Sequence, residues 1–399
     1  MIAIDTAEAI GRQNSDASEA ATWIEWLSLT GFRNYRHLRV EAGPGPVVLY
    51  GANGSGKTNL LEAVSLLSPG RGLRRAAYPD LTCAAAEAPW AVAARVHVDG
   101  NWSDVGTGLQ AGKVGGERTG RLVRINGTQQ TGSGALGFVQ MIWLTPASDG
   151  LFTAAASERR RFLDRLTAAF DPGHATRAGH FERAMRQRNR LLDDGVTAPA
   201  RYEGLEILMA EAAVAMAAAR VETVAALNAE MAARRARDPQ SPFPWADIEL
   251  EGDIEATLAS HAAVDAEDNY RRRLASSRER DRAAGRTLEG PHRSDLVVSH
   301  GPKQMPARLC STGEQKALLV GMVLAHAEQL TYRNGGAAPV MLLDEIAAHL
   351  DVVRRRALYR DIDRLGAQAW LTGTDREAFE GLPEATIFLN VEDGRVRSA

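Results

Sequence analysis

At residues 51–58 the chain reads Gly51-Ala52-Asn53-Gly54-Ser55-Gly56-Lys57-Thr58, which is the complete pattern of a phosphate-binding loop. The apolar run at 47–50 predicts a short buried strand before the loop, and residues 58–67 predict a helix after it. Backbone N–H groups of such a loop converge on a phosphate at the helix N-terminus, where the helix dipole adds roughly half a positive charge. Strand, loop and helix together therefore predict a nucleotide site.

Two side chains of the loop have chemical roles that their types suggest. Lys57 would reach the terminal phosphates of the nucleotide, and the Thr58 hydroxyl would hold Mg²⁺. The phosphate-contacting positions predicted from the loop itself are Gly51, Asn53, Gly54, Ser55, Gly56, Lys57 and Thr58.

A second motif follows a further apolar run. Residues 340–343 predict a buried strand that ends in two carboxylates, Asp344 and Glu345. In a nucleotide site the first carboxylate joins the Mg²⁺ shell and the second polarises the attacking water. Alone, this pattern is also that of an ordinary strand end at a surface. Its presence in the same chain as the phosphate-binding loop favours the catalytic interpretation.

A third motif, Ser311-Thr312-Gly313-Glu314-Gln315, leads into a helix expected at 316–329. A serine, a glycine and free backbone N–H groups at a helix start form either a second anion site or a simple N-cap. The segment resembles the signature motif of ABC-type ATPases, in which the serine of one subunit contacts the terminal phosphate bound by the other. Residues 347–351 look like the D-loop of that class. The resemblance implies two nucleotides held between two subunits.

Length and composition limit the classes of protein to which the chain can belong. The 399 residues carry a net charge of −3, with 45% hydrophobic and 24% charged residues, as in ordinary globular proteins of two or three domains. Two cysteines, Cys83 and Cys310, are too few for a disulfide framework and favour a reducing compartment. No apolar run approaches a membrane span, and the polar start lacks the features of a signal peptide, so a cytoplasmic protein is expected.

The order of strand patterns and helix patterns along the chain predicts an α/β fold. The first 145 residues read mainly as strands, a helical stretch follows, and strands then alternate with helices again. We expect an ABC-type ATPase head with a mixed sheet, interrupted by an inserted, mainly helical domain. The expected segments are a flexible tail at 1–22, the first half of the ATPase domain at 23–150, the helical insertion at 151–286 and the second half at 287–399. One helix is expected over 263–284.

The spacing between the motifs indicates which group of ABC-type ATPases the chain resembles. The interval between Thr58 and Ser311 is far longer than in transporter ATPase subunits, and the insertion is far too short for the coiled coils of SMC-type proteins. The motifs resemble one family closely, the RecF recombination-repair proteins. They cover nearly the whole chain from residue 23, at 31–35, 53–63, 67–72, 159–164, 186–192, 290–296 and 342–358. Ala147, Ala154 and Ala156 depart from the usual pattern of that family.

The resemblance implies an ATP-dependent DNA-binding protein of replication, repair and the SOS response to DNA damage. Such proteins bind DNA at single-strand gaps and duplex junctions, dimerise on ATP, and work with RecO and RecR to help load RecA. Their slow, DNA-stimulated ATP hydrolysis acts as a release switch. By resemblance, the nucleotide would also be contacted by Arg33, Asn34, Asn59, Gly313 and Asp351, and catalysis would rest on Glu345, Lys57 and Ser311, with Mg²⁺ held by Thr58 and Asp344.

The DNA surface has two candidate clusters of basic residues. One is the turn with Arg71, Arg74 and Arg75, and the other is Arg271, Arg272 and Arg273. Either could contact phosphates independently of sequence. Each could equally be a solvated surface, since acidic residues are close to the second cluster in the sequence.

Two further points stay open from the sequence alone. The segment 372–375 could sense the terminal phosphate or merely cap a strand. A transport-coupled ATPase without a DNA role, or a scaffold that binds nucleotide without hydrolysing it, would carry the same phosphate-binding loop.

Overall fold

The computed structural model describes residues 22–110, 120–347 and 350–398, so nearly all of the predicted tail and two residues of the D-loop-like segment lie outside the described residues. The chain divides into two compact units. The first contains the residues up to Ser148, Gln240–Phe243 and Leu319 onward, and the second contains Asp149–Pro239 and Pro244–Leu318. Among the described residues, no helix combines the length and the apolar character needed to cross a bilayer.

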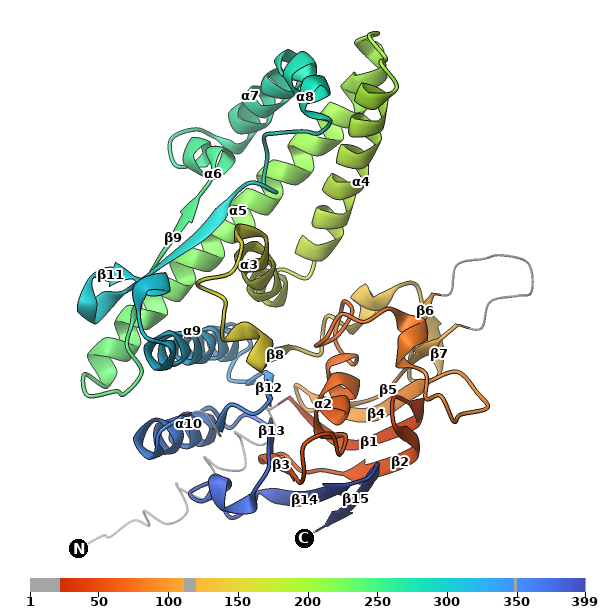
Figure 1. The fold of residues 1–399 in the computed structure, drawn as a ribbon, viewed down its shortest axis with the longest axis vertical. Coiled ribbons are helices and arrows are strands. Elements are labelled where there is room, and N and C mark those ends of the chain that lie inside the picture. The colour runs from red at the N-terminus through yellow and green to blue at the C-terminus, as the bar shows by residue number, and fades with distance from the viewer. Residues whose placement is uncertain (1–21, 111–119, 348–349, 399) are drawn as a thin grey trace, which may run out of the picture. The chain divides into compact units, whose positions relative to one another are not determined.

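The first unit is built around a six-stranded, mostly parallel sheet (Figure 1). Its order is β15 (Arg395–Ser398), β14 (Ile387–Glu392), β3 (Val47–Tyr50), β13 (Ala369–Gly373), β12 (Val340–Leu343) and β8 (Met141–Leu144). Only β15 is antiparallel to its neighbour. Because the carboxyl ends of parallel strands meet at one edge, the ends of β3, β12 and β13 bring the loops that follow them together.

A second sheet in this unit is antiparallel. It has the order β2 (Tyr35–Glu41), β1 (Trp23–Phe32), β4 (Ala91–Val98), β5 (Asn101–Leu109), β6 (Arg121–Ile125) and β7 (Thr128–Gln130). Helix α2 (Lys57–Ser65) contacts β1 of this sheet and β13 of the other, and its apolar side chains join one core with both. The sequence pattern did not reveal β5, since Gly106 and Gly108 weaken its strand signal.

The second unit is mainly helical. It contains α3 (Ala156–Phe170), α4 (His174–Asp193), the long α5 (Ala200–Arg237), α6 (Asp253–Leu258), α7 (Ala263–Ser276) and α8 (Arg278–Ala284). Helix α5 contacts α3, α4, α6 and α7. The single helix expected over 263–284 is instead two helices, because Ser277 ends α7 and begins α8.

A small sheet completes this unit, with the order β11 (Met305–Pro306), β10 (Asp295–His300) and β9 (Ala246–Glu251). Strand β10 pairs with β9 along its whole length and so belongs to this compact unit, which continues to Leu318, whereas the sequence pattern placed the end of the helical insertion at 286. The side chains of Arg159 and Arg160 fix α3 to this sheet, through the Asp295 carboxylate and the Ser294 carbonyl. Helix α9 (Thr312–Arg333) begins in the second unit and continues into the first, and α10 (Val352–Leu365) belongs to the first unit.

Candidate nucleotide-binding site

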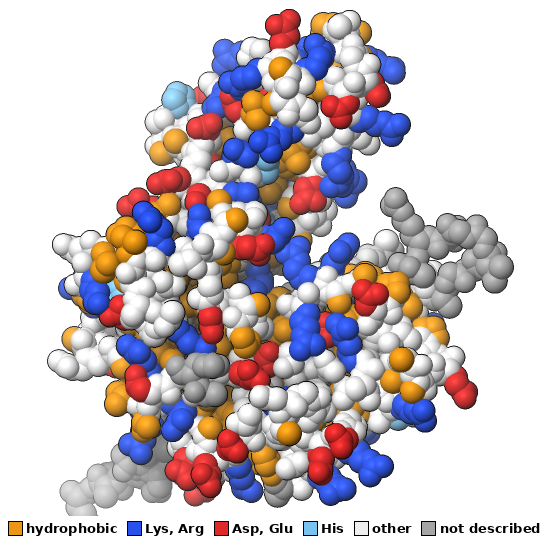
Figure 2. Space-filling model, viewed as in Figure 1, with side chains coloured by type: hydrophobic (Ala, Val, Ile, Leu, Met, Phe, Trp, Pro, Cys, Tyr) orange, Lys and Arg blue, Asp and Glu red, His pale blue; other side chains and the backbone are white. Residues whose placement is uncertain are grey.

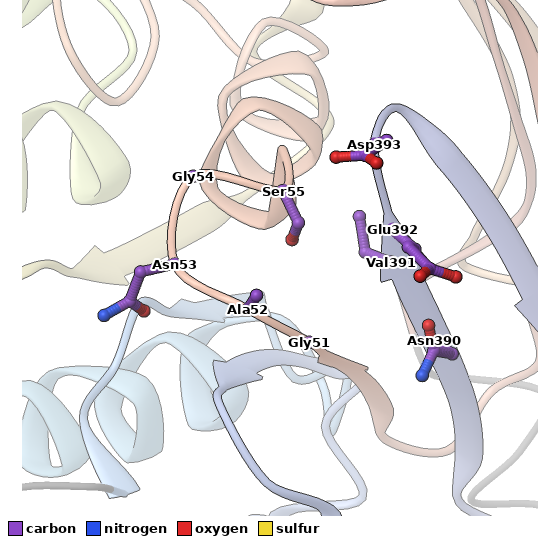
Figure 3. A pocket seen from close by; sticks show the side chains of 9 residues that line it. All are labelled: Gly51, Ala52, Asn53, Gly54, Ser55, Asn390, Val391, Glu392 and Asp393. Carbon is purple, nitrogen blue, oxygen red and sulfur yellow. The ribbon is translucent and has the colours of Figure 1, made fainter.

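The phosphate-binding loop lies between β3 and α2, as its sequence predicts. Close packing requires glycine at two of its positions, Gly51 and Gly56, and Figure 3 shows the path of the loop from Gly51 to Ser55. A Cβ on Gly56, which has a φ of 116°, would lie 2.5 Å from Asn34 Nδ2 and 2.6 Å from Tyr35 Oη. A Cβ on Gly51 would lie 2.2 Å from the Val391 carbonyl oxygen. The path of the loop therefore depends on side-chain-free positions at both ends.

Lys57 begins α2 and is almost fully buried. Its Nζ donates hydrogen bonds to the carbonyls of Gly51, at 2.6 Å, and Ala52, at 2.8 Å. Burial lowers the pKa of Lys57, while the carboxylates of Glu345 and Asp344 partly restore it. The two carboxylates are thus near enough to act on the ammonium electrostatically, and the cation is held within the loop.

Thr58, Asp344 and Thr372 form one hydrogen-bonded group at the carboxyl edge of the sheet. Both hydroxyls donate to Asp344 Oδ1, Thr58 at 2.9 Å and Thr372 at 2.8 Å. Burial raises the pKa of Asp344, against the lowering effect of these hydrogen bonds. A hydroxyl and a carboxylate oxygen in contact are hard oxygen donors of the kind that Mg²⁺ accepts together with phosphate oxygens and water. The predicted metal residues therefore fit that ion.

Glu345 follows directly and has a left-handed backbone, with a φ of 55°. Such a conformation costs a residue with a side chain about 1–2 kcal/mol. The Glu345 N–H donates to Thr372 Oγ1 at 2.8 Å, which secures this conformation. One threonine hydroxyl thus connects both carboxylate residues. This contact makes Thr372 a site residue, a role that the sequence alone left open.

A second network joins the turn after β1 to the start of α2. Asn34 Nδ2 donates to the Ser55 carbonyl at 3.3 Å, and Asn59 Nδ2 donates to Asn34 Oδ1 at 2.8 Å. Arg33 makes a two-pronged ion pair with the buried Glu62, with both N–O distances at 2.9 Å. The structure therefore brings the predicted residues Arg33, Asn34 and Asn59 to the loop and fixes them there.

The basic turn at 71–75 has one member that takes part in the nucleotide site. Arg71, Arg74 and Arg75 are all exposed. Arg74 nevertheless donates to Asn59 Oδ1 at 2.9 Å, and its charge lowers the pKa of Asp344. Arg74 is therefore directed toward the nucleotide site rather than only toward solvent.

The signature-like segment belongs to the second unit. The backbone N–H of Ser311 donates to Glu314 Oε2 at 3.0 Å, and Lys303 forms an ion pair with the same carboxylate. These contacts, Lys303 first, lower the pKa of Glu314 to about 2. Ser311 thus stands at the start of α9 with its backbone N–H held in a capping arrangement, and Gly313 lies in the first turn of the helix. Asp351, in the first unit, caps α10 by accepting from the Arg354 N–H at 2.9 Å.

The other basic cluster is largely neutralised. Arg271 pairs with Asp268 at 2.9 Å, and Arg273 pairs with both Asp253 and Glu289. Only Arg272 of the three has no carboxylate partner among the described residues. This pattern is what a solvated helix face would show.

A cavity of about 360 Å³ adjoins the loop on the side of the β14–β15 hairpin (Figure 3). Its lining combines residues 51–55 with Asn390, Val391, Glu392 and Asp393, and the Gly394 N–H donates to the Ser55 carbonyl at 3.3 Å. No sequence signal predicted that residues 51–55 lie beside residues 390–394, because the two segments are more than three hundred positions apart in the chain. Lys57 and Thr58 do not line the cavity, and two of the side chains that do, Glu392 and Asp393, are acidic, so this cavity is poorly suited to phosphate groups.

Replacing Thr372 by valine tests the connection between the two carboxylate residues. Valine keeps the shape but removes the donor to Asp344 and the acceptor for the Glu345 N–H. We expect the rate of ATP hydrolysis to fall about tenfold to a hundredfold, with ATP binding reduced much less. The measurement is phosphate release beside titration with a fluorescent ATP analogue. Thr374→Val is the control, since the Thr374 hydroxyl contacts only the neighbouring Asp375 in the described structure.

Comparison with known proteins agrees with this geometry. The family model described as RecF/RecN/SMC N terminal domain matches residues 23–396. The chain is 54% identical to the DNA replication and repair protein RecF of Mesorhizobium japonicum, over 94% of this chain and 98% of the relative. It is 51% identical to that of Brucella suis biovar 1, over 94% and 95%.

Solved structures show the same fold. The recombination mediator protein RecF-ATP in the RecFOR pathway is 22% identical, with a TM-score of 0.81 over 96% of this chain and 98% of that one. An SMC head bound to the C-winged helix domain of ScpA has a TM-score of 0.54 at 17% identity, over 94% and 97%. The predicted fold, an α/β ABC-type ATPase head with a mixed sheet and an inserted helical part, is confirmed.

Proposed function

This chain belongs to the RecF family of DNA replication and repair proteins, and we propose from this premise that it is an ATP-dependent DNA clamp of recombinational repair. It binds gapped DNA and junctions between single strands and duplex, dimerises on ATP, and acts in the cytoplasm with RecO and RecR to help load RecA. The observation that carries the proposal is the group formed by Thr58, Asp344, Thr372 and Glu345 beside a complete phosphate-binding loop.

The chemistry of this group supports hydrolysis rather than binding alone. Lys57 and the loop N–H groups neutralise the phosphates, and Thr58 with Asp344 would hold Mg²⁺, which supplies positive charge to the phosphate oxygens. Glu345 accepts a proton from water as the water oxygen bonds to the γ-phosphorus and the bond to the bridging oxygen breaks, so that ADP leaves. A scaffold that does not hydrolyse nucleotide would have no need for Glu345.

The signature-like segment supports the proposal that two copies dimerise. Ser311 and Gly313 lie at the start of α9, where the positive end of the helix dipole suits the terminal phosphate of a nucleotide bound by a second copy. ATP would then hold two copies together, and slow hydrolysis, stimulated by DNA, would release them. Asp351 would contribute to the same contact.

The test is DNA binding by fluorescence anisotropy on a gapped duplex, with ATP, with ADP and with the metal removed by EDTA, for the wild-type chain and Lys57→Ala. We expect binding at least about tenfold tighter with ATP, and loss of this ATP effect in the variant, because an unneutralised phosphate weakens the nucleotide complex. Binding that is absent, or indifferent to nucleotide, would contradict the clamp and favour a transport-coupled ATPase or a scaffold.

A further inference from the structure

One face of α4 carries arginines that the nucleotide site does not use. Arg183, Arg186 and Arg190 are exposed, whereas Phe181, Ala184, Arg188 and Leu192 on the opposite face are buried. At 100° per residue the three exposed arginines fall within about 60° of one another, and they span roughly 10 Å along the helix axis. Figure 2 shows several basic side chains, with a few acidic ones among them, in the region of α4.

Little opposing charge restrains these side chains. Arg186 lies 3.5 Å from Glu182, with both side chains more than 60% exposed, and Arg190 lies 3.9 Å from Asp194. Arg183 has no carboxylate partner among the described residues. Exposed ion pairs at these distances contribute about 0–1 kcal/mol, so a stronger anion can displace them.

A further exposed arginine lies on the segment that follows α8 and contacts α4. Both the N–H and the hydroxyl of Thr287 donate to Asn189 Oδ1, at 2.9 Å and 2.7 Å, which fixes the segment after α8 against α4. The preceding residue, Arg286, is exposed and has no carboxylate partner among the described residues. Arg183, Arg186 and Arg190 together are named the α4 basic surface.

The character of this surface favours nucleic acid over a protein partner. Protein interfaces centre on apolar and aromatic side chains, whereas DNA interfaces are polar and strongly positive. None of the large exposed apolar side chains of the described residues belongs to α4. By contrast, three arginines of α7 and α8, Arg271, Arg273 and Arg280, are paired with Asp268, Asp253 and Glu289.

We propose that the α4 basic surface binds the phosphate backbone of DNA independently of base sequence. The inference rests on the proposed DNA-binding function and deepens it by locating the contact. Arginine guanidinium groups spaced along one helix face contact successive phosphates of a strand, and each contact releases a counterion.

The experiment compares two triple variants of the full chain that remove the same charge. One is Arg183→Ala, Arg186→Ala and Arg190→Ala, and the other is Arg271→Ala, Arg272→Ala and Arg280→Ala. Affinity for a gapped duplex with ATP is measured by anisotropy from about 50 to 200 mM salt. Circular dichroism and binding of a fluorescent ATP analogue verify that each variant is folded. A third variant replaces the α4 arginines by lysine.

We expect the α4 alanine variant to bind DNA about tenfold to a hundredfold more weakly, with the slope of log affinity against log salt smaller by about 3. The α7–α8 variant should change little, and the lysine variant should keep the salt slope, because it keeps the charges.

The outcomes separate the two claims. Failure of the wild-type chain to bind DNA overturns the proposed function and this inference with it. If the wild-type chain binds while the α4 alanine variant keeps its affinity and salt slope, only the location is overturned. Equal losses in both alanine variants would also overturn it, since they would report net charge alone. DNA binding that persists while binding to polyglutamate is lost would assign the surface to an acidic protein.

Discussion

Replacement of Glu345 by glutamine should slow ATP hydrolysis by about 10²–10⁴-fold while ATP binding is retained. The amide has nearly the shape of the carboxylate but cannot accept a proton from the attacking water. The backbone contact between the Glu345 N–H and Thr372 Oγ1, at 2.8 Å, does not depend on the side chain and is kept. Phosphate release under single-turnover conditions measures the chemical step, and titration with a fluorescent ATP analogue measures binding.

The same variant also separates hydrolysis from clamp formation. If ATP closes the dimer and hydrolysis opens it, Glu345→Gln should hold gapped DNA with ATP longer than the wild-type chain does. Glu384→Gln is the control, because Glu384 is exposed in the loop before β14 and has no ion-pair partner among the described residues. Hydrolysis within about threefold of wild type would show that another group accepts the proton.

The parts of the site that the sequence predicted are contiguous in the chain. Residues 51–58 define their own loop, because glycines, a lysine and a threonine at fixed spacing leave little choice of backbone path. The location of Asp344 and Glu345 was predictable, because residues that directly follow an apolar strand of a parallel sheet lie at the carboxyl edge of that sheet. Both predictions concern local geometry and the residue types that phosphate and Mg²⁺ require.

The parts that the sequence could not predict depend on which strands are neighbours. Thr372 reaches Asp344 because β13 lies between β3 and β12, and this strand order is a property of the whole sheet. Val391 contacts Gly51 because β14 pairs with β3. The direction of Arg74 follows from the position of Asn59 on α2, which three residues of basic sequence do not reveal.

Charge patterns were the least informative part of the sequence. The run at 271–273 has the higher density of arginine, but its carboxylate partners include Asp253 and Glu289, which are 20 and 16 positions from Arg273. On α4 the arginines are interrupted by residues of the buried face, so the stripe appears only when the helix is seen in three dimensions. Local charge counting therefore could not tell which runs of arginine the fold neutralises.

Replacement of Arg188 by leucine should destabilise the helical unit by about 3–5 kcal/mol, because it leaves buried carboxylates without their cation. Arg188 is fully buried and donates to Glu206 at 3.1 Å, to Asp281 at 2.8 Å and to the Leu274 carbonyl at 2.7 Å. These contacts join α4 to α5, α7 and α8 through one side chain. Urea unfolding, with hydrogen exchange to follow the amides of α4 and α5, measures the loss.

The control lies on the same helix, two residues further along. Arg190→Leu removes an equal charge from an 85% exposed side chain and should cost less than about 0.5 kcal/mol. A triple variant with Arg188→Leu, Glu206→Gln and Asp281→Asn should recover part of the lost stability, since removing both carboxylates relieves their uncompensated burial. A loss below about 1 kcal/mol in Arg188→Leu would show that Arg278, which also binds Glu206, and Ser277, which binds Asp281, suffice to stabilise these carboxylates. The buried network would then serve to align the four helices rather than to hold them folded.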